Sequence, residues 1–231
     1  MKLCVIIPTL NEEKNIYKLF KRINKTKVKL DILFIDDNSL DKTQSFIKEL
    51  KKKNKNIKYI FRKNRTGIGS AHKEGIKFCY KKKYDLIITM DGDGTHDPKY
   101  FKQMISNSKK FDYVITSRFK KPNLLKDWPL SRKILTYSRH FIVKFFLGIN
   151  FDASGAYRCF SVKKIRLQDI LSSKNNDYAF FWEVTYILKK EGYKIYEIPV
   201  KLVFRKLGKS KMKIRHIIYS LYYLLKLSLL R

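Results

Sequence analysis

Apolar runs alternate with amphipathic stretches along the first half of the chain. Short apolar runs are typical of buried strands, whereas apolar residues three and four positions apart indicate helices. The runs predict strands at 2–7, 31–35, 57–61, 86–90 and 112–117. The stretches between them predict helices at 12–25, 42–53 and 98–108, and another that follows a loop at 62–70 and ends near residue 82. This alternation favours an α/β fold, a mostly parallel sheet with helices on both faces.

The pattern is less regular after residue 118. Helical spacing occurs at 131–147, 163–172, 180–191 and 212–230, with one more strand expected near 194–204. Because no repeat or linker-like segment divides the chain, we expect one domain at 1–211. Residues 212–231 then form an amphipathic C-terminal helical extension.

Composition adds a strong positive charge to this picture. The 231 residues include 52 Lys and Arg against 20 Asp and Glu, which gives a formal net charge of +32. A hydrophobic content of 44% can fill a core, so the chain is not a disordered polyelectrolyte. The charge favours anionic partners, namely nucleic acid, an anionic membrane surface or phosphorylated substrates. Three scattered cysteines without metal-ligand spacing indicate reduced core residues of a cytoplasmic protein.

The most informative segment follows the strand at 86–90. It reads Asp91-Gly92-Asp93-Gly94-Thr95 and places two carboxylates one residue apart. Two carboxylates at this range repel each other unless a cation lies between them. Hard oxygen ligands suit Mg²⁺ or Mn²⁺, which usually also bind substrate phosphates. A polar turn after a strand is the alternative explanation.

Two further acidic clusters follow other predicted strands, at Glu12-Glu13 and Asp36-Asp37. Parallel strands would bring all three clusters to one edge of the sheet, where a nucleotide and a metal ion could bind. Helix capping is the alternative, and we prefer it for Glu13 and Asp41. For Asp37, Asp91 and Asp93 we prefer the site. The segment Gly67-Ile68-Gly69-Ser70 could cradle a phosphate, but it lacks the full spacing of phosphate-binding motifs. It therefore indicates a tight turn near the nucleotide.

Short motifs occur in order along nearly the whole chain. They are Pro8-Thr9-Leu10-Asn11-Glu12, Asp36-Asp37-Asn38-Ser39, Gly67-Ile68-Gly69-Ser70-Ala71, Asp91-Gly92-Asp93-Gly94-Thr95-His96-Asp97-Pro98, Ser117-Arg118-Phe119, Ser154-Gly155-Ala156-Tyr157-Arg158 and Arg205-Lys206-Leu207-Gly208-Lys209-Ser210-Lys211. In this order they resemble family 2 glycosyltransferases of the GT-A fold, most of all the dolichyl-phosphate or polyprenyl-phosphate mannosyl- and glucosyltransferase branch. The chain departs from that pattern at Leu10, at Gly92 and Gly94, and at Phe204.

The resemblance implies a role for each matching position. It implies nucleotide-sugar binding by Pro8, Leu10, Glu12, Ile35, Asp37, Asp91, Gly92, Asp93, Arg205 and Lys211. It implies metal binding by Asp91, Asp93 and Thr95, and acceptor-phosphate binding by Arg118, Arg132 and Thr136. It implies catalytic roles for Asp93, Arg118, Arg205 and Lys211.

The expected reaction is an inverting, metal-dependent transfer with Mg²⁺ or Mn²⁺. The donor would be a nucleotide-diphosphate sugar, GDP-mannose first, with mannose or glucose moving to a polyprenyl or dolichyl monophosphate. Transfer to a hydroxyl of a surface polysaccharide or glycolipid is an alternative, with Asp152 as the general base. Asp152 and Glu183 could equally be a capping residue and the partner of a buried arginine such as Arg158. A basic nucleic-acid-binding protein is the non-enzyme alternative, which the acidic edge disfavours.

Two apolar segments suggest contact with a membrane. Residues 212–231 combine apolar and basic positions, and residues 141–147 form a second apolar patch. The first fits an amphipathic helix lying on an anionic surface. We therefore expect a cytoplasmic protein bound peripherally to the inner face of the membrane, without a nucleic-acid partner. The alternative is packing on the sheet, on a membrane-protein partner or in a homo-oligomer.

Overall fold

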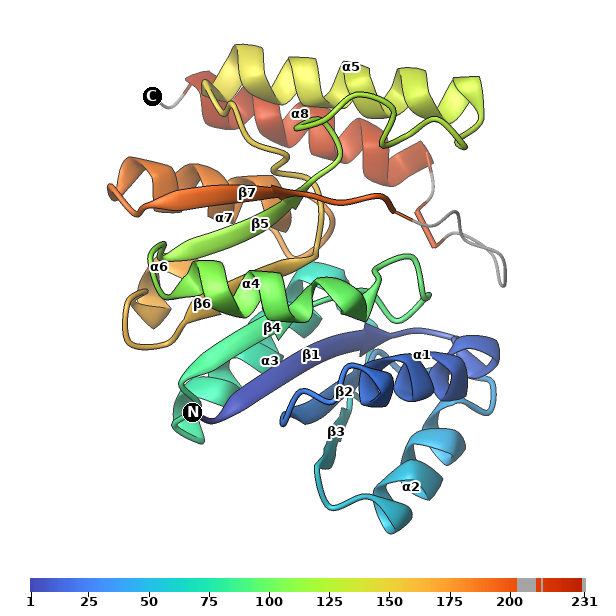
Figure 1. Cartoon of the computed structure of the whole chain (residues 1–231). Helices are drawn as coiled ribbons and strands as arrows, with labels where there is room; N and C mark the ends of the chain where they lie inside the picture. The colour runs from blue at the N-terminus through green and yellow to red at the C-terminus, as the bar shows by residue number, and fades with distance from the viewer. Residues whose placement is uncertain (203–210, 213, 230–231) are drawn as a thin grey trace.

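A twisted sheet runs through the protein, with helices on both faces (Figure 1). The computed structural model describes residues 1–202, 211–212 and 214–229. In these residues seven strands lie in the order β3-β2-β1-β4-β6-β5-β7. Their bounds are β1 Leu3–Thr9, β2 Asp31–Asp36, β3 Ile57–Phe61, β4 Leu86–Thr89, β5 Tyr113–Ser117, β6 Arg158–Ser161 and β7 Ile195–Pro199. Only β6 is antiparallel to its neighbours, so the described sheet is mostly parallel.

The two faces of the sheet carry separate hydrophobic cores. Alternate side chains of a strand point to opposite faces, so Val5 and Cys4 of β1 belong to different cores. One face is covered by α1 Glu13–Lys25, α2 Thr43–Lys53, the 3₁₀-helix η1 Pro98–Tyr100 and α4 Phe101–Ser108. The other is covered by α3 Ile68–Lys81, α6 Leu167–Leu171 and α7 Phe180–Lys190.

A further pair of helices lies beyond β7. Helices α5 (Leu130–Leu147) and α8 (Ile214–Leu229) run side by side at the top of Figure 1. Val143 and Leu224 pack there against Trp182 of α7. These contacts attach the C-terminal helix to the body of the protein. None of the helices in the described ranges has the length and apolar character needed to cross a membrane.

The structure confirms the predicted order of elements through β5. Later, the expected helix at 163–172 shortens to Leu167–Leu171, and the expected strand at 194–204 ends at Pro199 within the described residues. The antiparallel β6 was not predicted at all. Cys4, Cys79 and Cys159 are free and buried, as the sequence indicates.

Candidate active site

The sheet brings the three acidic clusters to one edge. Strand β1 pairs in parallel with both β2 and β4, so all three end on the same side. Glu12 follows β1, Asp37 follows β2 and Asp91 follows β4. We call these acidic positions the carboxylate edge.

Asp36 and Asp37 have different environments although they are neighbours. Asp36 is fully buried and accepts hydrogen bonds from Thr9 Oγ1 (2.8 Å), from both Ser39 donors and from Gln44 Nε2 (2.7 Å). These bonds connect β1 to the start of α2, so Asp36 has a structural role. Asp37 instead pairs with Arg62 Nη1 at 2.9 Å. Burial raises the pKa of Asp37 above its ordinary value, and the Arg62 charge opposes that rise.

Glu12 lies close to Lys211, which is near the C-terminal end of the sequence. Lys211 Nζ lies 3.7 Å from Glu12 Oε1 and donates to the Asn11 carbonyl at 3.1 Å. Lys211 therefore places a positive charge at the carboxylate edge. Arg205, which the sequence assigns to the same task, and Phe204 lie outside the described residues.

Glu13 and Asp41 are capping residues, as preferred from the sequence. The backbone N–H of Glu13 donates to Asp41 Oδ2 at 3.2 Å. In return, the Lys42 N–H donates to Glu13 Oε2 at 3.1 Å. The two carboxylates thus accept hydrogen bonds from backbone N–H groups at the starts of two helices.

Hydrogen bonds from neighbouring side chains fix the conformation of the loop after β4. Asp93 Oδ1 accepts from the Thr95 N–H (3.0 Å) and from Thr95 Oγ1 (2.7 Å). His96 Nδ1 accepts from the Asp91 N–H at 2.9 Å, which leaves the ring proton on Nε2. Burial lowers the pKa of His96 to about 4, so the ring is neutral at pH 7. Arg22 donates to the Gly94 carbonyl at 2.7 Å and fixes the far side of the loop.

This loop fits a divalent cation with few protein ligands. Asp91 and Asp93 offer hard carboxylate oxygens, and the Thr95 hydroxyl supports Asp93. The described residues contain no group of three or more His, Cys, Asp or Glu side chains placed to hold a metal. The remaining positions would therefore fall to substrate oxygens and water, as is usual for Mg²⁺.

The glycines of two motifs are required for packing. A Cβ on Gly92 would lie 3.0 Å from the Pro8 carbonyl, so Gly92 packs against the end of β1. A Cβ on Gly67, whose φ is +96°, would lie 2.4 Å from the Asn176 carbonyl. That carbonyl also accepts from the Ser70 N–H at 3.0 Å. The Gly67 turn is thus a docking point for residue 176, which agrees with the expected tight turn.

Arg118, at the end of β5, forms a buried pair with Asp152. Its Nε and Nη2 bind the two Asp152 oxygens at 2.7 and 2.6 Å, and Nη2 also donates to Ser154 Oγ at 2.6 Å. Burial disfavours both charges, but their pairing outweighs it. The pKa of Asp152 is lowered and that of Arg118 is raised. An engaged carboxylate of this kind is poorly suited to be a general base, which weakens the hydroxyl-acceptor alternative.

Glu183 and Arg158 do not pair with each other, and each forms hydrogen bonds with other residues. Glu183 accepts from the Lys174 and Asn175 N–H groups and from the Tyr223 hydroxyl. Arg158 donates to the Tyr113 hydroxyl at 2.7 Å and to Thr185 Oγ1 at 3.0 Å. Glu183 therefore supports the backbone of a loop.

Helix α5 carries the other residues expected to bind the acceptor. Arg132 stacks over the Trp128 ring at 4.6 Å, and Thr136 is buried one turn further on. The charges of Arg118 and Arg132 both act on Arg139, and Asp91 acts on Arg118. Arg118 therefore lies near Asp91 of the carboxylate edge, and Arg139 lies near both Arg118 and Arg132.

Comparison with known proteins identifies the family. Residues 4–172 match the family described as glycosyl transferase family 2. The chain belongs to this family. Its membership favours the enzyme interpretation of the carboxylate edge over the nucleic-acid alternative.

Relatives with named activities cover nearly the whole of this glycosyltransferase. An undecaprenyl-phosphate mannosyltransferase of Micrococcus luteus is 28% identical over 213 residues, which are 92% of this chain and 88% of that protein. A polyprenol monophosphomannose synthase of Mycolicibacterium smegmatis is 27% identical over 211 residues, 90% of this chain and 80% of that protein.

Solved structures share the GT-A fold. Glucosyl-3-phosphoglycerate synthase of Mycobacterium tuberculosis, in complex with Mn²⁺ and UDP-glucose, superposes with a TM-score of 0.62 at 14% identity. The match covers 97% of this chain and 76% of that one. At this identity the likeness shows the fold alone.

Three residues expected to line the glycosyltransferase's nucleotide site lie at the ends of β1 and β2. Pro8 and Ile35 are buried and pair with each other in the sheet. Leu10 is partly exposed just after β1. Their binding roles stay predictions.

Arg62 and Arg139 were not predicted from the sequence to belong to the site. Arg139 could have been found from spacing, because it lies seven positions after Arg132 and three after Thr136 on one helix. Arg62 gave no such signal, since its partner Asp37 follows a different strand and lies 25 positions earlier in the sequence.

Proposed function

We propose that this protein transfers a hexose from a nucleotide-diphosphate sugar to a polyprenyl monophosphate, with inversion at the sugar carbon. GDP-mannose is the first choice of donor. The names of the Micrococcus and Mycolicibacterium relatives support the polyprenyl-phosphate acceptor and mannose. The observation that carries the proposal is the orientation of α5.

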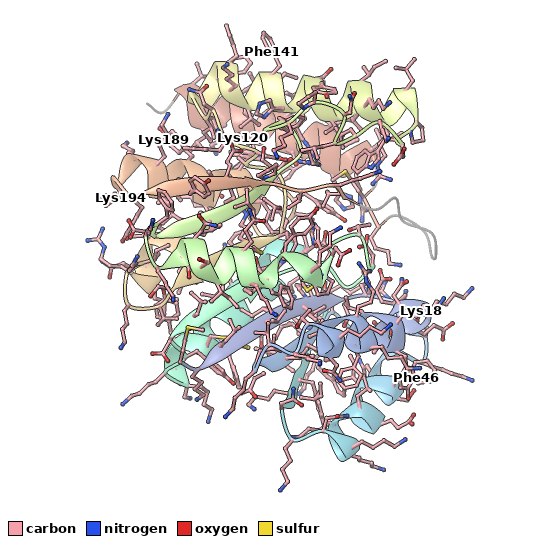
Figure 2. The ribbon with its side chains drawn as sticks, in the orientation of Figure 1. Lys18, Phe46, Lys120, Phe141, Lys189 and Lys194 are labelled. Carbon is pink, nitrogen blue, oxygen red and sulfur yellow. The ribbon has the colours of Figure 1, made fainter. Side chains whose placement is uncertain are left out.

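Helix α5 is polar toward the protein and apolar toward its surroundings over its first turns. Arg132, Thr136 and Arg139 share one face, on which Thr136 is buried, Arg139 is partly buried and Arg132 is exposed. The other face exposes Leu130 by 72% and Ile134 by 57%. Phe141 points away from the body of the protein (Figure 2). A helix on a water-soluble surface has the opposite pattern. A phosphorylated lipid matches both faces, since its phosphate needs cations and its chain needs an apolar surface.

The donor would lie along the carboxylate edge. Asp37, held by Arg62, can accept hydrogen bonds from a base. Asp91 and Asp93 would hold Mg²⁺ or Mn²⁺ on the diphosphate, and the ion supplies positive charge that offsets the leaving group. Lys211 adds charge at the same edge. Arg205 is proposed for the same role from the sequence alone.

The acceptor phosphate would lie between β5 and α5. The bonds to Asp152 and Ser154 use Nε and Nη2 of Arg118 and so orient the guanidinium, which leaves Nη1 for a phosphate oxygen. Arg132 and Thr136 would complete this site. A phosphate monoester has a second pKa of about 6, so it is already an anionic nucleophile at pH 7. No general base is then required, which agrees with the engaged state of Asp152.

The function is tested with a panel of donors and acceptors. We expect release of GDP from GDP-mannose only when farnesyl phosphate, a short polyprenyl monophosphate, is present with Mg²⁺ or Mn²⁺. EDTA should abolish the release. Release with a UDP-sugar would change the donor and keep the reaction. Turnover with a hydroxyl acceptor alone would refute the phosphate acceptor, and failure to bind any nucleotide sugar would refute the function.

We also propose that α5 and α8 dock on an anionic membrane surface. Exposed apolar side chains cover both helices: Leu130, Ile134, Leu135, Tyr137, Phe141, Phe145, Ile214, Ile217, Ile218, Tyr219, Leu221, Tyr222, Leu225 and Leu229. Neither helix contains Asp or Glu, whereas Lys144, Arg215 and Lys226 are exposed on them. Apolar area together with unopposed positive charge suits anionic headgroups.

Replacing Phe141 and Phe145 with Asp should weaken vesicle binding about tenfold or more, because two large apolar contacts are lost. Cosedimentation with vesicles of equal phosphatidylglycerol and phosphatidylcholine measures it. Tyr59→Asp is the matched control, since Tyr59 is an exposed aromatic residue of the edge strand β3. Unchanged vesicle binding, or a change from dimer to monomer in light scattering without vesicle binding by the native chain, would contradict the membrane proposal.

A further inference from the structure

Arg139 of α5 is partly buried and has one buried polar atom without a partner. Its Nε atom is fully covered, yet no described residue offers it a hydrogen bond. Buried polar atoms in native proteins almost always have a partner, because leaving one unpaired costs stability. Such a group needs an explanation, and a bound substrate is one of the explanations.

The charges around Arg139 point to an anion. Asp152 is the nearby carboxylate that favours the charge of Arg139, and Arg118 already binds both of its oxygens. Arg118 and Arg132 repel Arg139. Burial and these neighbours lower the pKa of Arg139 to about 10, but the group stays charged at pH 7. His140, whose pKa is also lowered, adds no charge there at neutral pH.

The surrounding elements supply no further carboxylate for Arg139 within the described residues. Glu197 of β7 accepts from the Asp152 N–H at 2.6 Å and lies 3.7 Å from Lys120 Nζ, so it is already engaged. Asp152, which acts on Arg139, is thus already bound by Arg118. A dianion bound among the three arginines would restore the balance.

We propose that Arg139 is a third guanidinium that binds the acceptor phosphate, with Arg118 and Arg132. This inference rests on the proposed function and extends its acceptor site by one residue. Arg118 holds the phosphate from β5, whereas Arg132 and Arg139 approach it from two turns of α5. Three positive charges distinguish a monoester dianion from a diester, which has one negative charge. The site would therefore select terminal phosphates over phospholipid headgroups.

The test compares Arg139→Gln and Arg139→Lys with the native chain. Lys194→Gln is the control, because Lys194 is an exposed cation just before β7 and lies outside the proposed acceptor and membrane sites. We expect Arg139→Gln to raise the KM for farnesyl phosphate about ten- to a hundredfold and to leave the KM for the donor unchanged. Arg139→Lys should have a smaller effect, since it keeps the charge without the planar fork.

Two further measurements separate a binding role from a structural one. In ³¹P NMR, the second pKa of bound farnesyl phosphate should be lowest in the native chain and should rise in Arg139→Gln, because one facing charge is lost. Without ligand, the Tm of Arg139→Gln should equal or exceed that of the native chain, since the buried, unpaired Nε is removed. If Arg139→Gln fails to fold, Arg139→Lys carries both comparisons.

The outcomes are distinct. Unchanged acceptor KM and unchanged bound-phosphate pKa in both variants would overturn the role of Arg139 while the proposed function stands. Equal losses for donor and acceptor, with a lowered Tm, would assign Arg139 to structure and also overturn it. If the native chain neither binds nor uses farnesyl phosphate, the proposed function itself fails, before any variant is compared.

Discussion

Asp93→Asn is expected to lower the transfer rate about a thousandfold, which is the cost of removing a strong electrostatic stabiliser of a leaving group. The change removes one of the two carboxylate charges of the loop after β4. The fold should survive, because the Asn carbonyl oxygen can still accept from the Thr95 N–H and hydroxyl as Asp93 Oδ1 does. The measurement is nucleotide release at saturating donor and acceptor over a range of Mn²⁺ concentrations.

The control for this substitution is Asp127→Asn, which removes an exposed carboxylate that pairs with Lys201. It should leave the rate unchanged. An Asp93→Asn protein that retains native activity and the native response to Mn²⁺ would remove Asp93 from the reaction. The carboxylate edge would then need another metal ligand.

Asp152→Asn should lower the free energy of unfolding by about 3–5 kcal/mol, because it leaves the buried Arg118 charge without its counterion. Arg118 is 7% exposed and Asp152 is 2% exposed, so water cannot replace the lost partner. Urea unfolding at pH 7 measures the loss. Since the pKa of Asp152 is lowered in the folded chain, the native pair stabilises above the unfolded pKa of about 4. That contribution is lost as the pH falls through the folded pKa.

The double variant Arg118→Met with Asp152→Leu tests the explanation. It removes both charges and keeps apolar volume, so its loss of stability should be smaller than that of Asp152→Asn. Equal losses would show that packing or the hydrogen bond to Ser154 dominates. A single-variant loss below about 1 kcal/mol would mean that the pair behaves like a surface ion pair.

Local periodicity explains why the first half of the fold could be predicted. Each strand from β1 to β5 is an apolar run, and each intervening helix has a clear apolar face, so neighbouring residues carry the signal. Strand β6 has four residues, Arg158–Ser161, with Arg and Ser at its ends. Its position depends on antiparallel pairing with β4 and β5, which are distant in sequence. No local pattern could reveal it.

In the candidate active site too, local sequence patterns predicted some features, whereas contacts between distant residues could not be predicted. The carboxylate edge followed from the ends of three parallel strands, and the resemblance named Arg118 and Lys211. The sequence could not show that Asp152 binds Arg118, or that Arg62 binds Asp37, because those partners lie on separate elements. The glycines of the Gly67 turn carried a motif signal, but their packing against Asn176 depends on the finished fold.

The position of β6 sets the order in which the protein can fold during synthesis. Strand β4 has an unpaired edge until residues 158–161 emerge from the ribosome. The Gly67 turn gains its contact with Asn176 only after residue 176 has also been synthesised. An unpaired central strand is open to wrong partners, so the nascent chain passes through an aggregation-prone stage. The pairing of β4 is therefore completed only after β6 has been synthesised, and contacts between distant residues lower the folding rate.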